Sequence, residues 1–144
     1  MSERKHAILS ASSAHRWLAC PPSAKFCAEA GDRTSEYAMQ GTDAHSLCEY
    51  RLLKALGKKA EDPTVSLAYF DDEMSDCADS YVQYVMEQVG TAKQKCTDPI
   101  VLIEQRLDFS RYVPDGFGTG DCVIVADGML SVIDFKYGVG IVVE

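Results

Sequence analysis

The sequence predicts a protein of the α/β or α+β class, with amino-terminal helices packed on a β-sheet. Two observations lead to this prediction. Apolar residues recur at spacings of three and four in two segments before residue 96, which is typical of amphipathic helices. From Pro99 onward, short apolar runs are separated by turn-forming residues, which is typical of strands. The chain has 144 residues, 47 % of them apolar, so we expect one domain over residues 1–144.

Three helices are expected before the strands. Residues 10–20 form a short one, which begins at serine caps and stops at two prolines. Residues 28–41 are polar and are predicted as a loop. The second helix covers residues 43–56, with Thr42 as its cap and a glycine at its end. The third spans residues 71–95 and is opened by acidic side chains.

The last part of the chain is predicted to form a three-stranded meander. Residues 100–107 form the first strand, and Asp127-Gly128 lies between two further apolar runs. This dipeptide predicts a two-residue hairpin loop, which pairs Ala126 with Met129. Both faces of the hairpin are largely apolar, so we expect both to be covered. Residues 141–144 are predicted to begin another strand.

The predicted register places two acids opposite each other. Asp121 pairs with Asp134, with Cβ atoms about 5 Å apart. Lys136 follows Asp134 by two residues and therefore points to the same face. Like charges directly opposite each other destabilise a sheet. A divalent cation together with Lys136 would offset this repulsion.

The helix predicted over residues 43–56 adds candidate ligands. His45 and Glu49 are four positions apart, so both lie on one face, near the positive end of the helix dipole. If this face docks over Asp121 and Asp134, one site holds an imidazole, three carboxylates and a lysine. This ligand set suits Mg²⁺ or Mn²⁺.

Phosphodiester hydrolysis is the expected use of such a site. A metal ion on Asp121 and Asp134, with His45 completing its ligands, would polarise a phosphate and lower the pKa of bound water. Lys136 would hold or deprotonate the attacking water, or neutralise the developing charge. Glu49 would hold a second metal ion or act through water.

Each of these residues also has a structural interpretation. Asp121 and Asp134 could be solvated strand ends, and Lys136 could be a surface lysine. His45 could be a packed or capping residue. Glu49 could pair with a neighbouring cation on its own helix.

The net charge of −8 argues against a simple nucleic-acid coat, but the charge is unevenly distributed. Residues 1–60 contain nine Lys and Arg against six Asp and Glu, whereas residues 61–144 contain five against sixteen. A polyanion is therefore expected to approach the amino-terminal part. The acidic part would need metal ions to tolerate phosphate.

The cysteines and the lack of sorting signals predict a cytoplasmic protein without a membrane partner. We find neither a signal peptide nor an apolar run long enough to span a bilayer. The six cysteines form no C-x-x-C pair and are expected to be reduced thiols. An alternative is an iron–sulfur site that includes Cys20, whose other ligands would lie at unrelated spacings.

Three segments together resemble the PD-(D/E)XK nucleases, in particular their RecB-type exonuclease branch. Asp121 followed by Asp134-Phe135-Lys136 is similar to the core motif of that family. Gly41-Thr42-Asp43-Ala44-His45 with Glu49 is similar to its G-T-x-x-H…E helix, and residues 10–21 resemble its S-x-S…C-P segment. The most similar members are exonucleases of phages and prophages.

The resemblance implies a restriction-endonuclease-like core with a mixed β-sheet and a Mg²⁺- or Mn²⁺-dependent deoxyribonuclease activity. The residues that carry over as metal ligands are His45, Asp121, Asp134 and the backbone carbonyl of Phe135. Those that carry over as catalytic residues are Glu49, Asp121, Asp134 and Lys136.

The resemblance further implies DNA as a partner, with linear ends as the substrate and phage recombination proteins as associates. Members of the family continue with a Gln-x-x-x-Tyr helix and another strand, and by this comparison we expect the chain to be truncated after the third core strand. A sheet that ends there has an exposed edge, which predicts a homo-oligomer. The alternative function is a nuclease-like fragment that binds DNA or a protein partner without cutting.

Overall fold

The computed structural model describes residues 6–31 and 34–138, which form helices and a three-stranded antiparallel sheet. The mixed α and β composition confirms the predicted fold class. The chain divides into two compact units. One contains the described residues up to 31 together with residues 106–119, and the other contains residues 34–105 and 120–138.

The amino-terminal unit begins with short helices. A 3₁₀ turn at Ala11–Ser13 leads into α1 (Ala14–Ala19), which confirms the first predicted helix. A helix that the sequence analysis missed, α2, follows at Pro22–Ala30. Proline is well suited to the first turn of a helix, so the two prolines that end α1 also begin α2.

Helix α3 (Glu36–Ala55) is longer than predicted, and the predicted loop over residues 28–41 is wrong. Its cap is Ser35, whose hydroxyl accepts the N–H of Ala38 at 3.2 Å, and not Thr42. The Thr42 hydroxyl donates to the Ala38 carbonyl at 3.0 Å inside the helix. His45 therefore lies in the middle of α3, away from the positive end of the helix dipole. The helix ends before Gly57, as predicted.

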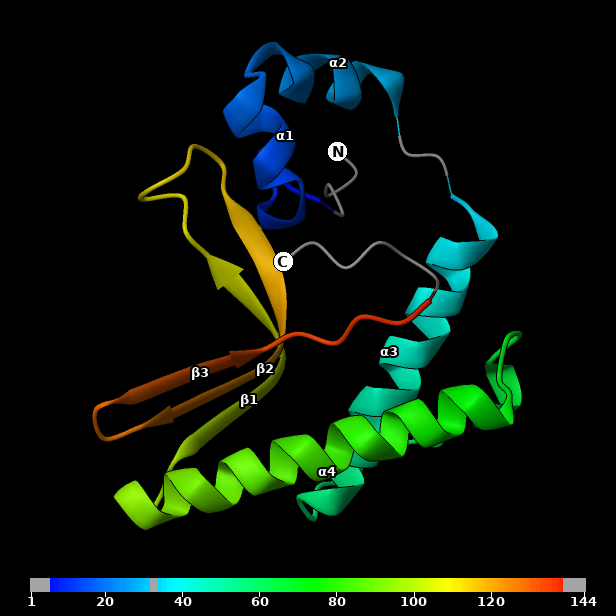
Figure 1. The fold of residues 1–144 in the computed structure, drawn as a ribbon, viewed down its shortest axis with the longest axis vertical. Helices are drawn as coiled ribbons and strands as arrows, with labels where there is room; N and C mark the ends of the chain where they lie inside the picture. The colour runs from blue at the N-terminus through cyan, green and yellow to red at the C-terminus, as the bar shows by residue number, and fades with distance from the viewer. Residues whose placement is uncertain (1–5, 32–33, 139–144) are drawn as a thin grey trace. The chain divides into compact units, whose positions relative to one another are not determined.

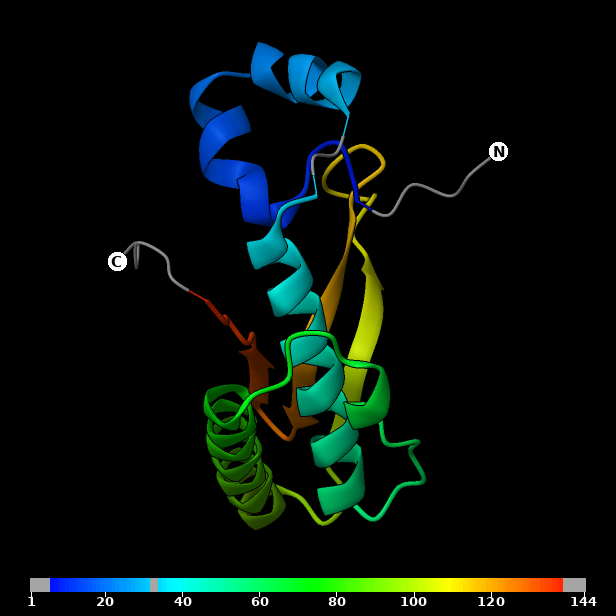
Figure 2. The same cartoon turned by 90° about the vertical axis from the view of Figure 1, so that its right-hand side faces the viewer.

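Helix α4 (Asp72–Lys95) confirms the third prediction and crosses α3 (Figure 1). The Asp71 carboxylate caps it by accepting the N–H of Met74 at 2.7 Å. Arg51 of α3 joins the two helices, because its guanidinium donates to the Ser75 carbonyl and to Asp79, each at 2.7 Å. In Figure 2, α4 lies beside the lower end of α3.

The sheet has the order β1-β2-β3, with β1 at Ile100–Asp108, β2 at Phe117–Ala126 and β3 at Met129–Ile133. The pairing of Ala126 with Met129 confirms the predicted register and the two-residue loop. Gly128 has φ of 68°, which the loop requires. The described strands are all antiparallel, in contrast to the mixed sheet that the resemblance implies. The strand predicted at 141–144 lies outside the described residues.

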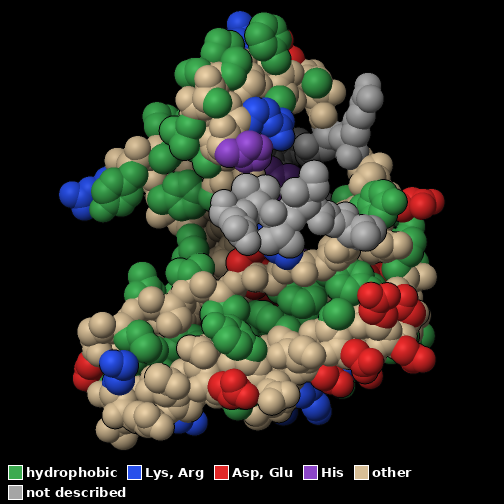
Figure 3. Space-filling view, in the orientation of Figure 1, with side chains coloured by type: hydrophobic (Ala, Val, Ile, Leu, Met, Phe, Trp, Pro, Cys, Tyr) green, Lys and Arg blue, Asp and Glu red, His purple; other side chains and the backbone are tan. Residues whose placement is uncertain are grey.

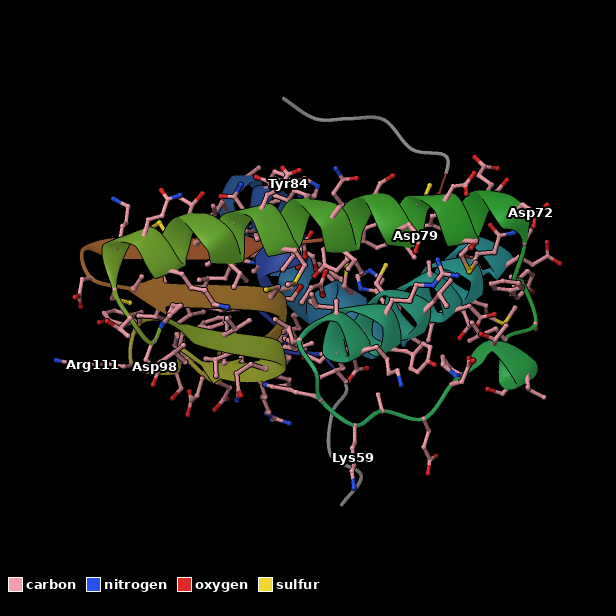
Figure 4. All side chains as sticks on the ribbon, turned by 90° about the horizontal axis from the view of Figure 1, so that it is seen from below. Lys59, Asp72, Asp79, Tyr84, Asp98 and Arg111 are labelled. Atoms are coloured by element: carbon pink, nitrogen blue, oxygen red, sulfur yellow. The ribbon has the colours of Figure 1, made fainter. Side chains whose placement is uncertain are left out.

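The core lies between the two long helices and one face of the sheet. Seen from below (Figure 4), α4 runs along both α3 and the strands. The fully buried core residues of the helices include Leu47, Leu52, Met74 and Val85, and those of the sheet include Cys122 and Ile124. Burial of such side chains contributes roughly 1.5–3 kcal/mol each.

The other face of the hairpin is covered only in part. Val123 is 5 % exposed, whereas Val125, Leu130 and Val132 are 37 %, 68 % and 62 % exposed. The expectation that both apolar faces are covered therefore holds fully for one face only. The reason is that both long helices pack on the face that carries Ile124 and Ile133.

Two leucines of the second unit test this assignment of the core. Leu52→Ala removes a fully buried side chain and is expected to lower the free energy of unfolding by about 2–5 kcal/mol. Leu130→Ala, on the exposed face, is expected to change it by less than about 1 kcal/mol. Urea denaturation followed by circular dichroism measures both, and equal losses would contradict the assignment.

Candidate metal centre

Three side chains from different elements converge in the second unit. His45 of α3, Glu104 of β1 and Asp121 of β2 each offer one ligand atom, and these atoms lie within 4.8 Å of one another. Among the described residues this is the only group of three or more His, Cys, Asp or Glu side chains with that property. An imidazole nitrogen and two carboxylate oxygens are a donor set that fits a divalent cation.

Asp121 is the most firmly held member of the group. The backbone ladder between β2 and β3 ends at the pair of Cys122 and Ile133. Just beyond it, Asp121 Oδ2 accepts the backbone N–H of Phe135 at 2.7 Å. Its other oxygen, Oδ1, faces Nδ1 of His45 at 3.4 Å. Asp121 is only 8 % exposed, so these two contacts fix both of its oxygens.

The aromatic ring of Phe135 holds the imidazole from another side. The ring centroids of His45 and Phe135 are 5.5 Å apart in an edge-on arrangement. Tyr81 of α4 packs on the same phenylalanine, with its centroid 5.2 Å away. Phe135 therefore supports the centre twice, through its ring and through its N–H. Its predicted role as a ligand through the carbonyl stays a prediction.

Glu104 reaches the centre through an irregular backbone. Val101 and Ile103 pack against the core, so strict alternation would point Glu104 away from it. Glu104 instead has φ of 47°. This left-handed conformation costs a residue with a Cβ about 1–2 kcal/mol. Such strain occurs preferentially at functional sites. Glu104 is thus both the residue with the strained backbone and one of the three candidate ligands.

The electrostatics of the centre reflect crowded negative charge. The hydrogen bond to Asp121 raises the pKa of His45 above 6.5, although burial opposes this. Burial raises the pKa of Glu104, and the charges of Asp121 and Glu49 add to the effect. Burial would also raise the pKa of Asp121, but hydrogen bonds from His45 and Phe135 outweigh it and hold this pKa below 3.8.

Asp134 and Lys136 lie outside the group of converging ligand atoms. They pair with each other, with Lys136 Nζ 2.6 Å from Asp134 Oδ2, and their side chains are 51 % and 81 % exposed. From the sequence, α3 was expected to dock over both Asp121 and Asp134. Asp121 does face His45 of α3, but the helix packs on the side of Ile133 and Phe135, and Asp134 lies away from it. Both charges still act on the centre, since Asp134 raises the pKa of His45 and Lys136 lowers that of Asp121.

The other predicted residue, Glu49, is half-buried on α3, one turn after His45. It is not one of the converging ligands, but its charge helps to raise the pKa of Glu104. The acids at the start of α4 are exposed and gather on the surface, as Figure 3 shows. They contribute no ligand to the centre.

Sequence reasoning missed Glu104. The available signal was an acid that directly follows the apolar run Ile100-Val101-Leu102-Ile103 within a predicted strand. A regular strand would have placed this acid on the face opposite to Ile103. The positive φ that reverses its direction is not visible in the sequence, because glutamate does not favour that conformation.

The titration of His45 tests the contact with Asp121. In the metal-free protein, NMR should give His45 a pKa above 6.5. The charged imidazole therefore stabilises the fold below pH 6.5, and this contribution is lost as the pH rises through the folded pKa.

Asp121→Asn should lower the pKa of His45, because the negative charge is lost while burial remains. Asp127→Asn, in the exposed hairpin loop, is the control, and an unchanged His45 pKa in Asp121→Asn would refute the contact.

The backbone at Glu104 is tested by a pair of substitutions. Glycine adopts positive φ freely, so Glu104→Gly should be more stable than Glu104→Ala by about 1 kcal/mol. Within an ordinary strand the order is the reverse. Chemical denaturation of both metal-free variants measures the difference. A more stable alanine variant would mean that Glu104 is not strained.

Comparison with known proteins places the chain in a family without assigning a function. No solved structure matches it. None of the helices in the described part of the chain has the length and apolar character needed to cross a bilayer. The family model described as "Protein of unknown function (DUF2800)" matches residues 6–144, and the chain therefore belongs to this family.

Proposed function

We propose that this protein is a metal-dependent nuclease that hydrolyses phosphodiester bonds of DNA. The observation that carries the proposal is the convergence of His45, Glu104 and Asp121 in a half-buried centre. The resemblance of its motifs to the RecB-type PD-(D/E)XK nucleases supports it. On the same resemblance we propose linear DNA ends as the substrate, and a place in a phage or prophage recombination module.

His45, Glu104 and Asp121 would hold the metal ion, for which we propose Mg²⁺ or Mn²⁺. Oxygen ligands suit both ions, and the imidazole is well accepted by Mn²⁺. When bound, such an ion polarises a phosphate oxygen and lowers the pKa of a coordinated water. Burial is the main reason why the pKa of Glu104 is raised, and the hydrogen bond to Asp121 is the main reason for His45, but nearby carboxylates add to both shifts. A cation would neutralise that negative charge.

The residues of the chain would position the reaction. Asp121 is fixed by Phe135 and His45, so its orientation is set before a ligand arrives. Lys136 supplies a positive charge whose field already reaches Asp121. We propose that Lys136 holds the attacking water or neutralises charge on the phosphate. Asp134, the present partner of Lys136, would orient its ammonium group, and Glu49 would act through Glu104 or water.

One observation favours the alternative of a protein that binds without cutting. Lys136 and Asp134 neutralise each other in a solvent-exposed pair. If that pair persists with DNA bound, Lys136 is unavailable for chemistry. Binding and cutting must therefore be measured separately.

Metal binding is tested by calorimetric titration with Mn²⁺. We expect Glu104→Gln and Asp121→Asn each to weaken binding at least tenfold, because each removes a charged ligand from a group of three. Asp127→Asn removes the same charge from the exposed hairpin loop and should leave binding unchanged. Equal affinity in all four proteins would refute the centre.

Hydrolysis is tested on linear and circular DNA with Mg²⁺, Mn²⁺ or EDTA. Metal-dependent loss of linear DNA, abolished by Asp121→Asn and strongly reduced by Lys136→Ala, is the expected result. Asp127→Asn is again the control. Metal binding that depends on Asp121, without any cutting, would instead establish the alternative.

A further inference from the structure

We propose that the tip of the hairpin between β1 and β2, residues 106–117, binds single-stranded nucleic acid by stacking a base on Tyr112 and pairing a phosphate with Arg111. The choice of nucleic acid as the partner rests on the proposed function. The tip belongs entirely to the first unit and contains none of the metal ligands. Its role can therefore be tested apart from the metal centre.

An exposed aromatic ring beside a cation carries this inference. Tyr112 is 80 % exposed, the largest exposed fraction of any aromatic residue in the described part of the chain. The guanidinium carbon of Arg111 lies 5.9 Å from the centroid of its ring. Figure 4 shows the labelled Arg111 side chain extending away from the ribbon. A planar aromatic surface next to a positive charge matches the base and the phosphate of one nucleotide.

A second pair of the same kind stands at the base of the tip. The guanidinium carbon of Arg106 in β1 lies 4.3 Å from the ring centroid of Phe117 in β2. Two cation–aromatic pairs are about what a chain of this length is expected to have, but here both lie on one hairpin.

The tip is preorganised by its own backbone. The N–H of Phe109 donates to the Gly116 carbonyl at 3.0 Å, and the N–H of Gly116 donates to the Val113 carbonyl at 2.8 Å. The Phe109 ring packs so closely on Gly116 that a Cβ there would come within 2.7 Å of it. Tyr112 is thus presented on a fixed loop, which reduces the entropy lost on binding.

The charge of the surrounding unit favours an anionic partner. The segments 1–33 and 106–119 contain seven Lys and Arg against five Asp and Glu, a balance of +2, whereas the rest of the chain has seven against seventeen, a balance of −10. Two of the five acids of this unit, Asp108 and Asp115, lie in the tip itself. The Asp108 carboxylate is held by a hydrogen bond within the tip, because it accepts the N–H of Ser110 at 2.8 Å.

The test is fluorescence anisotropy with a labelled oligothymidylate in EDTA, so that no cutting occurs. Tyr112→Ala should weaken binding about fivefold to a hundredfold, as is found for stacked bases. Tyr112→Phe keeps the ring and should bind like the wild type. Arg111→Ala should weaken binding and reduce the slope of log K against log salt by about 0.7. Tyr84→Ala, a 52 % exposed tyrosine on α4, is the matched control.

Several results would overturn the inference. These are no binding by the wild type, a Tyr112→Ala variant that binds normally, or an equal loss in Tyr84→Ala. Competition by polyglutamate as effective as by unlabelled oligothymidylate would also overturn it, since the tip would then be a simple anion site. Asp127→Asn, in the exposed loop between β2 and β3, should bind the oligonucleotide like the wild type. Failure of hydrolysis with intact binding would thus count against the proposed function and leave the tip assignment standing.

Discussion

The carboxylate of Asp121 is the contact on which the centre depends. It accepts the Phe135 N–H at 2.7 Å with one oxygen and faces His45 at 3.4 Å with the other. The first bond extends the β2–β3 pairing beyond the point where the backbone ladder ends, and the contact with His45 joins the hairpin to α3. A carboxylate that is 8 % exposed is tolerated only because both bonds and the nearby positive charge outweigh the loss of water. Removing it would leave His45 and Glu104 without a common neighbour.

The covered face of the sheet decides which residues reach this centre. Both long helices pack on the side of Ile124 and Ile133, so the side chains of that face form the core. Asp134 and Lys136 consequently lie in solvent, and Glu104 enters only through its positive φ. The centre thus combines one ligand from a regular helix, one from the end of a ladder and one from strained backbone.

Local signals in the sequence predicted the parts of the fold that local physics determines. Asp127-Gly128 was sufficient for the hairpin register, and Gly57 for the end of α3. His45 and Asp121 were also identified as candidate ligands. The spacing of His45 to Glu49, and the position of Asp121 relative to the hairpin loop, can be read directly from the sequence. The start of α3 was missed, since Ser35 competes with Thr42 as a cap and only tertiary context decides between them. Glu104 and the docking face of α3 depend on long-range packing, which no local pattern encodes.

The most direct measurement is the anomalous difference map of a crystal soaked in Mn²⁺. The arrangement of His45, Glu104 and Asp121 predicts one strong peak coordinated by all three. A peak held by Asp134 without Glu104, or the absence of any peak beside Asp121, would contradict the central claim that these three residues form a metal centre.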